Sequence, residues 1–230
     1  SRCDQHNIRI ISVEKNGSTA FAVYGYMNRG AHEGEVGVDI YYYDIEKNVV
    51  QEKAFIPSTK SFAIAEEELG KMVYYNQDQN LLYILAGGKF YKIDLTKDEQ
   101  TVLAKNLEEG QYTVSADGHL IAYQTSGTIN TAQEIKVLNL KTDEENAVAA
   151  KSGEAIRPLG FIGSDFVYGY LRQEDVGHTA AGGELFPMYE LEIRNSENEV
   201  MKTYSADQIY ISDVFIEENM MTLNLSLIHI

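Results

Sequence analysis

The sequence predicts an all-β fold, a β-propeller of four-stranded antiparallel blades, and three observations predict it. Short apolar strands recur along the chain, a turn signal precedes each one, and an alternating strand with a polar turn follows. Four short strands per repeat are typical of a propeller blade. Helical patterning is nearly absent, and the one candidate helix covers residues 63–69, before Gly70.

The apolar strands are the clearest part of the repeat. They occupy residues 21–26, 81–86, 120–123 and 166–170, and a fifth covers residues 220–223. A nearly continuous apolar strand has to be covered on both faces, as the blades of a propeller cover one another.

Turn residues precede each apolar strand. Asn16-Gly17 and Asp117-Gly118 are the strongest of these signals, because both dipeptides accept the positive φ angles of tight hairpins. We therefore expect the first two strands of each blade to form a hairpin.

A third strand alternates in polarity and ends in a polar turn. Its equivalent positions are Asp44, Asp94, Asn139 and Glu192, at spacings of 50, 45 and 53 residues. These spacings predict about four and a half blades in one domain, with an incomplete ring. The expected blades cover residues 8–57, 62–107, 111–156 and 157–204, and a partial blade covers residues 209–230.

The net charge of the chain disfavours some classes of binding partner. The chain carries 19 Lys and Arg against 35 Asp and Glu, a net charge of −16, which disfavours nucleic acid and anionic membrane surfaces. No apolar run approaches the roughly 18 residues that a membrane helix needs, so we expect no membrane insertion of this segment. Cys3 is the only cysteine, which excludes an internal disulfide.

Both ends of the sequence suggest a fragment. Ser1 stands where a methionine would begin a complete chain, and the last residues stop inside an apparent strand. Residues 225–230 resemble a translated transposon end of the kind used in sequencing libraries, which would make His229 an artefact. We therefore expect further sequence on both sides, where a signal peptide, an anchor or a catalytic domain would lie.

Residues 114–123 (VSADGHLIAY) and 135–140 (IKVLNL) resemble the TolB-type and WD40-like propeller repeats of bacterial envelope proteins. Residues 23–30 are similar to stretches of large uncharacterised bacterial proteins. The resemblance implies a propeller fold and an extracytoplasmic or cell-envelope location, while a cytoplasmic location stays open. It implies no activity, because one fold hosts many functions.

Catalytic and cofactor motifs find little support in the sequence. No G-x-S-x-G elbow, P-loop or dinucleotide fingerprint occurs. His32-Glu33 begins like a zinc-peptidase motif, but Val36 stands where the second histidine is needed. The acidic pattern that begins at Asp44 and at Asp94 imitates a calcium loop, and its repetition at one blade position favours Asx turns instead. We expect no metal and no cofactor.

Two loops carry the candidate site. The tetrapeptide Val-Tyr-Gly-Tyr occurs at residues 23–26 and 167–170, and a long charged loop follows each copy. The candidate ligand-binding residues in these loops are Arg29, His32, Glu33, Arg172, His178 and Glu184. Loops of this class emerge beside the central channel of a propeller, so these groups would converge if the ring closes. The competing interpretation is that both loops are simply solvated.

These observations favour a non-catalytic recognition or scaffold domain, of an extracytoplasmic bacterial protein, that binds a protein or glycan. The alternative is an accessory or catalytic propeller of a peptidase-type hydrolase or of a lyase whose remaining domain is missing. A purely structural spacer is a third possibility. Of the three tyrosines at residues 41–43, at least one ring should be exposed, where it would stack on a sugar or pack at a blade edge.

Overall fold

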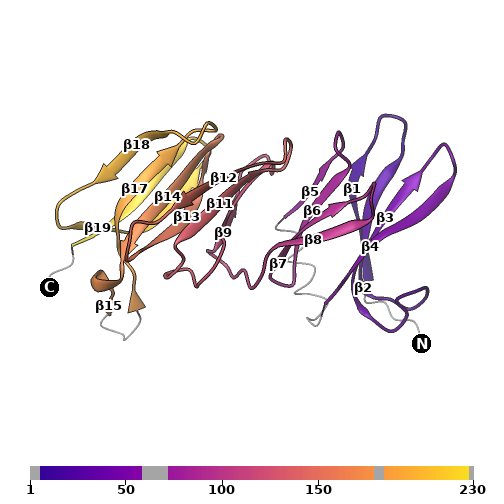
Figure 1. The fold of residues 1–230 in the computed structure, drawn as a ribbon, viewed down its shortest axis with the longest axis horizontal. Coiled ribbons are helices and arrows are strands. Elements are labelled where there is room, and N and C mark those ends of the chain that lie inside the picture. Colours follow the sequence, from indigo (N-terminus) through magenta and orange to yellow (C-terminus); the bar gives the residue numbers. More distant parts are fainter. Residues whose placement is uncertain (1–5, 59–71, 179–183, 228–230) are drawn as a thin grey trace. The chain divides into compact units, whose positions relative to one another are not determined.

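The computed structural model describes residues 6–58, 72–178 and 184–227 of the 230-residue chain. Cys3, the candidate helix at residues 63–69 and His229 lie outside the described residues. Strands dominate the described residues (Figure 1), and the helical element they contain is one 3₁₀ turn, η1 (Gln173–Asp175).

The first two sheets are four-stranded antiparallel meanders. Each is built from strands that follow one another in the chain, in the order β1-β2-β3-β4 and β5-β6-β7-β8. The first sheet contains β1 (His6–Val13), β2 (Thr19–Tyr26), β3 (Val36–Asp44) and β4 (Val49–Pro57). The second contains β5 (Val73–Asn76), β6 (Leu81–Ala86), β7 (Lys89–Asp94) and β8 (Glu99–Ala104).

The third and fourth sheets repeat this plan. The third contains β9 (Tyr112–Val114), β10 (Leu120–Gln124), β11 (Glu134–Asn139) and β12 (Glu144–Ala149). The fourth contains β13 (Glu154–Ile162), β14 (Asp165–Arg172), β17 (Met188–Arg194) and β18 (Val200–Ser205). A small hairpin of β15 (Gly177–His178) and β16 (Glu184–Leu185) lies between β14 and β17 in the chain.

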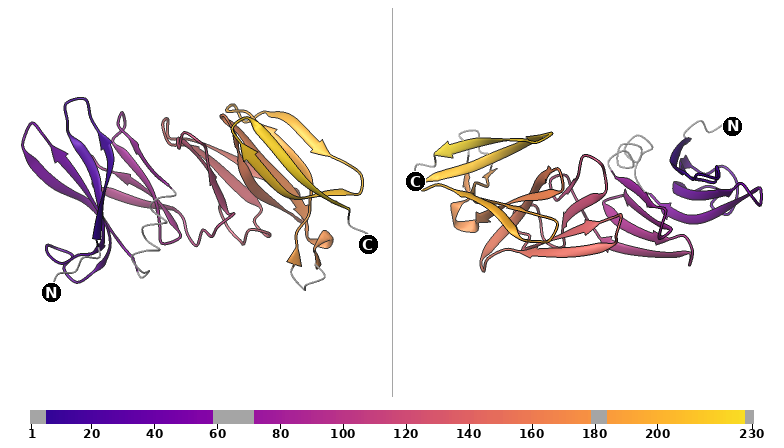
Figure 2. Two further views of the ribbon diagram at one scale, coloured as in Figure 1. Left: turned by 180° about the vertical axis from the view of Figure 1, so that it is seen from behind. Right: turned by 90° about the horizontal axis from the view of Figure 1, so that it is seen from above.

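A final hairpin joins the fourth sheet. It consists of β19 (Ile209–Glu217) and β20 (Met220–Leu227), and β19 meets β17 through the single pair Met188 and Ile211. Figure 2 shows this hairpin, in yellow, next to the orange strands of the fourth sheet. Four complete blades and a two-stranded fifth one confirm the predicted all-β propeller class and the count of four and a half blades.

The turns follow the residue chemistry that the sequence indicates. Gly17 and Gly118 have φ angles of 94° and 77°, in the turns that precede β2 and β10. In the turn between the third and fourth strands of the first blade, the Asp44 carboxylate accepts the N–H groups of Glu46 and Lys47 at 3.1 Å. Asp94 and Asn139 do the same in the next two blades, which confirms the Asx turns.

In the fourth blade, the residue that caps this turn is not the one that the repeat spacing predicts. Asn195, not Glu192, caps the equivalent turn, because its side chain accepts the N–H groups of Glu197 and Glu199. Glu192 lies inside β17, opposite Tyr168 of β14. The prediction of Glu192 is wrong, because β17 continues to Arg194 and the turn begins at Asn195, three residues later.

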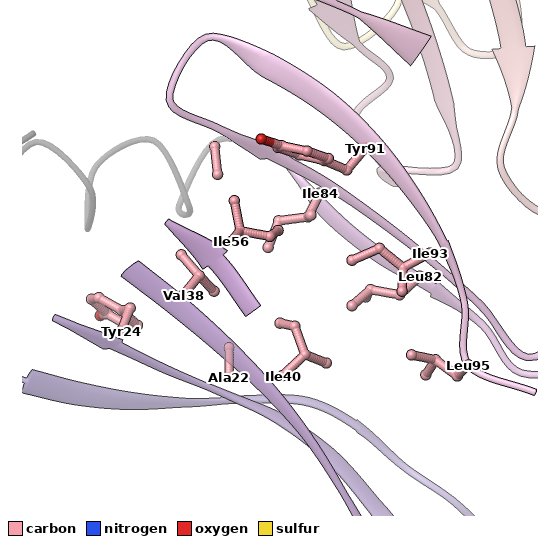
Figure 3. Close-up of a cluster of buried hydrophobic side chains, with 11 residues drawn as sticks. Ala22, Tyr24, Val38, Ile40, Ile56, Leu82, Ile84, Tyr91, Ile93 and Leu95 are labelled. Atoms are coloured by element: carbon pink, nitrogen blue, oxygen red, sulfur yellow. The ribbon is translucent and has the colours of Figure 1, made fainter. Parts of the chain in front are cut away.

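The chain forms two compact units, Ser1–Asn106 and Leu107–Ile230. In the first unit, apolar side chains of the first sheet pack on those of the second (Figure 3). Fully buried members include Ile40 and Ile56 of the first sheet and Leu82 and Ile84 of the second. A single domain over residues 1–230 stays a prediction.

The second unit has its own core. Its third and fourth sheets bury a cluster rich in aromatic rings, which includes Phe166, Tyr168 and Tyr170 of β14. The other face of the fourth sheet packs Leu171, Met188 and neighbouring apolar groups against the final hairpin. No helix in the described ranges is long and apolar enough to cross a membrane.

Candidate functional site

The first predicted loop folds back on the first sheet. The backbone N–H of Met27 donates to the carbonyl of Glu35, and the N–H of Gly34 donates to the carbonyl of Met27, each at 2.8 Å. Arg29 and Glu33 are exposed at the outside of this loop. The loop therefore presents these two predicted residues to solvent and turns a third one, His32, toward the sheet.

His32 lies on the ring of Phe55 from β4, with ring centroids 3.8 Å apart. Its Nε2 lies 2.9 Å from Glu52 Oε1, and its Nδ1 lies 3.7 Å from Glu35 Oε1. Desolvation lowers the pKa of His32, but the hydrogen bond and charge of Glu52 outweigh it, so that this pKa exceeds its ordinary value of 6.5. His32 is thus held by the sheet and by two carboxylates.

Asp39 is a buried acid beside this histidine. It projects from the centre of β3, is 2% exposed, and accepts a hydrogen bond from Tyr41 at 2.5 Å through Oδ2. Its Oδ1 is buried and has no hydrogen-bond partner within the described part of the chain. Desolvation, together with the charge of Glu52, raises the pKa of Asp39. A charged residue in a buried run of β3 was a signal that the sequence offered and that the predicted site did not include.

The three neighbouring tyrosines of β3 are all partly exposed. Tyr41 donates to Asp39, Tyr42 donates to Glu14 at 2.8 Å, and Tyr43 donates to Asn48 at 3.0 Å. Their hydroxyl groups therefore anchor the blade itself.

The second predicted loop begins at Arg172, the last residue of β14. The Arg172 guanidinium lies over the ring of Tyr189, with its central carbon 3.7 Å from the ring centroid. Its Nε lies 3.7 Å from Glu154 Oε1, and its Nη1 lies 3.8 Å from Asp175 Oδ2. Both distances are longer than a hydrogen bond, so these ion pairs leave the N–H donors of Arg172 without a protein acceptor in the described residues.

Tyr189 reaches Arg172 because of a bulge in β17. Tyr170 pairs with Glu190 and Leu171 pairs with Met188, which leaves Tyr189 as the extra residue between them. A bulge places two consecutive side chains on one side of a strand. Accordingly, Lys151 Nζ approaches both the Tyr189 hydroxyl, at 3.3 Å, and Glu190, at 2.8 Å.

Hydrogen bonds hold the Tyr189 ring under Arg172. Its hydroxyl donates to Glu154 Oε2 at 2.6 Å and accepts from Lys151. Desolvation and the bond to Glu154 raise the pKa of Tyr189 to about 12, which keeps the hydroxyl protonated at neutral pH. The hydrogen bond to Glu190 raises the pKa of Lys151 above its usual value. Arg172 therefore stacks on a ring whose position is set from two sides.

A pocket of about 470 Å³ opens beside this stack. We call it the Arg172 pocket; its lining residues are Arg172, Tyr189, Glu190, Ser205, Ala206, Asp207, Gln208, Ile209 and Tyr210. It lies between the ends of β14 and β17 and the turn that connects β18 to β19. That turn is tight: the Ile209 N–H donates to the Ala206 carbonyl at 3.2 Å, and Gln208 has a φ of 60°.

The side chains on the β18–β19 side of this pocket are unengaged. Ser205, Asp207, Gln208 and Tyr210 have no side-chain hydrogen bond or ion pair to the described part of the protein. Together with Arg172 they supply donors and acceptors at one opening. The sequence does not single out this segment, because short polar turns between strands are common and carry no distinguishing pattern.

A second pocket, of about 300 Å³, lies between the third and fourth sheets and includes Asn139, Arg194 and Asn195. Its polar groups are largely used by the fold. Asn139 and Asn195 cap their own turns, and Arg194 donates to Tyr168 at 2.5 Å and to the Asn198 carbonyl at 3.1 Å. This pocket is therefore less suited to ligand binding than the Arg172 pocket.

The remaining predicted residues lie in the β15–β16 hairpin. His178 is exposed, and its backbone pairs with that of Glu184. Figure 1 shows η1 and β15 beyond the end of β14. Within the described ranges, no group of three or more His, Cys, Asp or Glu residues is arranged to hold a metal ion. The convergence of the two loops, which belong to different compact units, stays a prediction.

No protein-family model matches the chain, and no curated protein matches it. Among solved structures, the chain is similar to the β-propeller domain of the trilobed protease from Pyrococcus furiosus. That similarity has 10% identity and a TM-score of 0.39, and it covers 96% of this chain and 69% of that one.

Two larger enzymes also show similarity. The tricorn protease is 14% identical with a TM-score of 0.37, over 81% of this chain and 18% of that chain. Porphyromonas gingivalis dipeptidyl peptidase 4 is 8% identical with a TM-score of 0.30, over 85% of this chain and 39% of that chain. The chain thus spans less than half the length of either enzyme, and at these values the likeness carries no argument about activity.

Proposed function

We propose that this chain is a non-catalytic recognition domain that binds a protein or glycan through the Arg172 pocket. One observation carries the proposal: the pocket gathers Arg172 and four unengaged polar side chains around a volume of about 470 Å³. The volume lies within the range of small-molecule sites, and polar groups in such sites fix the orientation of the ligand.

The carboxylates nearest the stack of Arg172 on Tyr189 already accept hydrogen bonds from the protein, which favours a binding role over a catalytic one. Glu154 accepts a hydrogen bond from Tyr189, and Glu190 accepts one from Lys151. Their partners fix the geometry of the pocket wall, as second-layer groups do in preorganised binding sites. The proposal includes an extracytoplasmic location and a kinship of the blades with TolB-type repeats. The net charge of −16 supports a partner other than nucleic acid.

The test is a binding screen with the purified full chain. The chain is labelled and applied to an oligosaccharide array and to a peptide array, and hits are titrated by calorimetry. We expect Arg172→Ala and Tyr210→Ala to weaken a hit by about tenfold or more, as removal of charged or aromatic contacts usually does. Lys202→Ala is the matched control, because Lys202 is exposed on β18 and does not line the pocket.

Mass spectrometry of the ligand after incubation separates binding from catalysis. The proposal expects recovery of the intact ligand. Cleavage that Arg172→Ala abolishes would instead support the hydrolase or lyase alternative, and binding that neither pocket substitution affects would place the site elsewhere.

A further inference from the structure

The Arg172 pocket offers a mixture of hydrogen-bonding groups rather than a single chemistry. Arg172 supplies only donors, Asp207 supplies only acceptors, and Ser205, Gln208 and Tyr210 supply both. Sugar hydroxyl groups each donate and accept, so they need such mixed partners. An apolar peptide side chain would find only Ala206 and Ile209 among the apolar residues of the lining.

The charges around the pocket decide between an acidic and a neutral ligand. Two cations, Arg172 and Lys151, face four carboxylates. These carboxylates belong to Glu154, Asp175, Glu190 and Asp207. Lys151 is paired with Glu190 at 2.8 Å, and Glu154 and Asp175 flank Arg172. An incoming carboxylate would meet an excess of negative charge at close range, where Coulomb repulsion is strong.

Glu190, which lines the pocket, is already engaged. Lys151 donates to it at 2.8 Å, and Arg172, stacked on Tyr189, places a second positive charge at the same wall. The excess of negative charge around the pocket therefore disfavours an acidic ligand.

We infer that the ligand of the Arg172 pocket is a neutral, hydroxyl-rich sugar, which Arg172 binds through the N–H edge of its stacked guanidinium. This inference rests on the proposed function and names the ligand class for the same site. The stack matters because a planar fork with a fixed orientation can donate two parallel hydrogen bonds to neighbouring oxygen atoms.

The experiment compares neutral and acidic sugars of equal length by calorimetry with the full chain. The neutral probes are galactotetraose, mannotetraose, cellotetraose and xylotetraose, and tetragalacturonate is the acidic partner of the first. We expect at least one neutral probe to bind, and tetragalacturonate to bind at least about tenfold more weakly than that probe, given like-charge repulsion at the pocket. The affinity of the neutral probe should change less than about twofold between low and high salt, because no net charge is neutralised.

Three variants test the role of the fork. Arg172→Lys keeps the charge but loses the planar donors, and we expect it to weaken the neutral probe about tenfold or more. Asp207→Asn should weaken it less, because the amide keeps one acceptor. Lys202→Ala should leave it unchanged.

Several results would overturn the inference. They are tighter binding of tetragalacturonate than of any neutral probe, binding of peptides alone, or full affinity in Arg172→Lys. In the first two cases the recognition function survives with a different ligand, and in the third the sugar binds without the guanidinium fork. If neither the sugars nor the peptide array give any binding, both the inference and the proposed function are wrong.

Discussion

At the scale of the residue, two side chains show what a linear pattern hides. Asp39 lies within an apolar strand at a position that the fold buries, and one of its oxygens has no partner within the described residues. Tyr189 reaches the pocket only because a bulge shifts it to the side of Glu190. A charged residue in an apolar run is visible in a sequence, whereas a bulge depends on the strand beside it.

The buried Asp39 makes stability depend on pH. Its folded-state pKa is raised above 3.8, mainly by desolvation, so the folded protein loses stability as the pH rises from 3.8 through that pKa. We expect Asp39→Asn to stabilise the protein at pH 7 by about 1 kcal/mol, because the amide carries no buried charge and still accepts from Tyr41. Denaturant unfolding at several pH values measures this difference.

The difference between Asp39→Asn and the parent should shrink as the pH falls below 3.8, where Asp39 becomes protonated in both states. Tyr41→Phe is a useful comparison, since it removes the hydrogen bond that Tyr41 donates to the carboxyl group. Equal stability of Asp39→Asn and the parent at every pH would show that Asp39 is not a source of strain.

At the scale of the element, the repeat is carried by its turns. Asp44, Asp94, Asn139 and Asn195 each cap the turn between the third and fourth strands of a blade, and each side chain accepts the N–H group two residues later. Local chemistry decides this feature, which is why three of the four positions could be predicted from spacing. The fourth could not, because β17 extends to Arg194, beyond the position that the spacing indicates.

The cap of the second blade provides an element-scale prediction. Asp94→Ala should lower the Tm by a few degrees, because the N–H groups of Thr96 and Lys97 lose their acceptor. Asp94→Asn should retain most of the stability, since Asn139 performs this role in the third blade. Calorimetry at neutral pH measures both.

The stability of the parent and that of Asp94→Asn should respond differently to acid. The backbone and side chain of Lys97 lower the pKa of Asp94, so its contribution is present above 3.8 and is lost as the pH falls through the folded-state pKa. Asp94→Asn should therefore lose less stability than the parent in acid. A parent and an Asn variant with identical acid profiles would contradict this account.

At the scale of the whole molecule, the chain consists of two compact units with a core in each. The repeat predicted one continuous domain, because every blade looks alike in sequence. Cores are built from contacts between sheets, and a repeat pattern does not say how cooperative those contacts are along the chain.

A substitution in one unit tests this cooperativity. A Cβ at Gly169 would clash with Met188 Sδ and lie 3.0 Å from Leu191 Cδ2, so Gly169→Ala should destabilise by about 1–3 kcal/mol through overpacking. We expect hydrogen exchange to accelerate throughout Leu107–Ile230 and to stay unchanged in Ser1–Asn106. Gly177→Ala is the matched control, because a Cβ there meets nothing within 4 Å.

Acceleration of exchange by the same factor in both units would show that the chain unfolds as a single domain. Such a result would favour the architecture that the repeat predicts.

By itself, the sequence determined the all-β class, the blade repeat and its hairpin turns, because strand polarity and turn chemistry are local properties. It also pointed to Arg172, through the long loop that follows residues 167–170. Only the tertiary structure decided what Arg172 does, since the bulge at Tyr189 and the turn at residues 205–210 lie far from it in the chain. The two copies of the tetrapeptide also differ in a way that only the structure shows. Gly25 adopts a positive φ of 126°, whereas Gly169 leaves room for the side chain of Met188. Identical residues therefore have different structural roles, because each glycine meets different neighbours in its own blade.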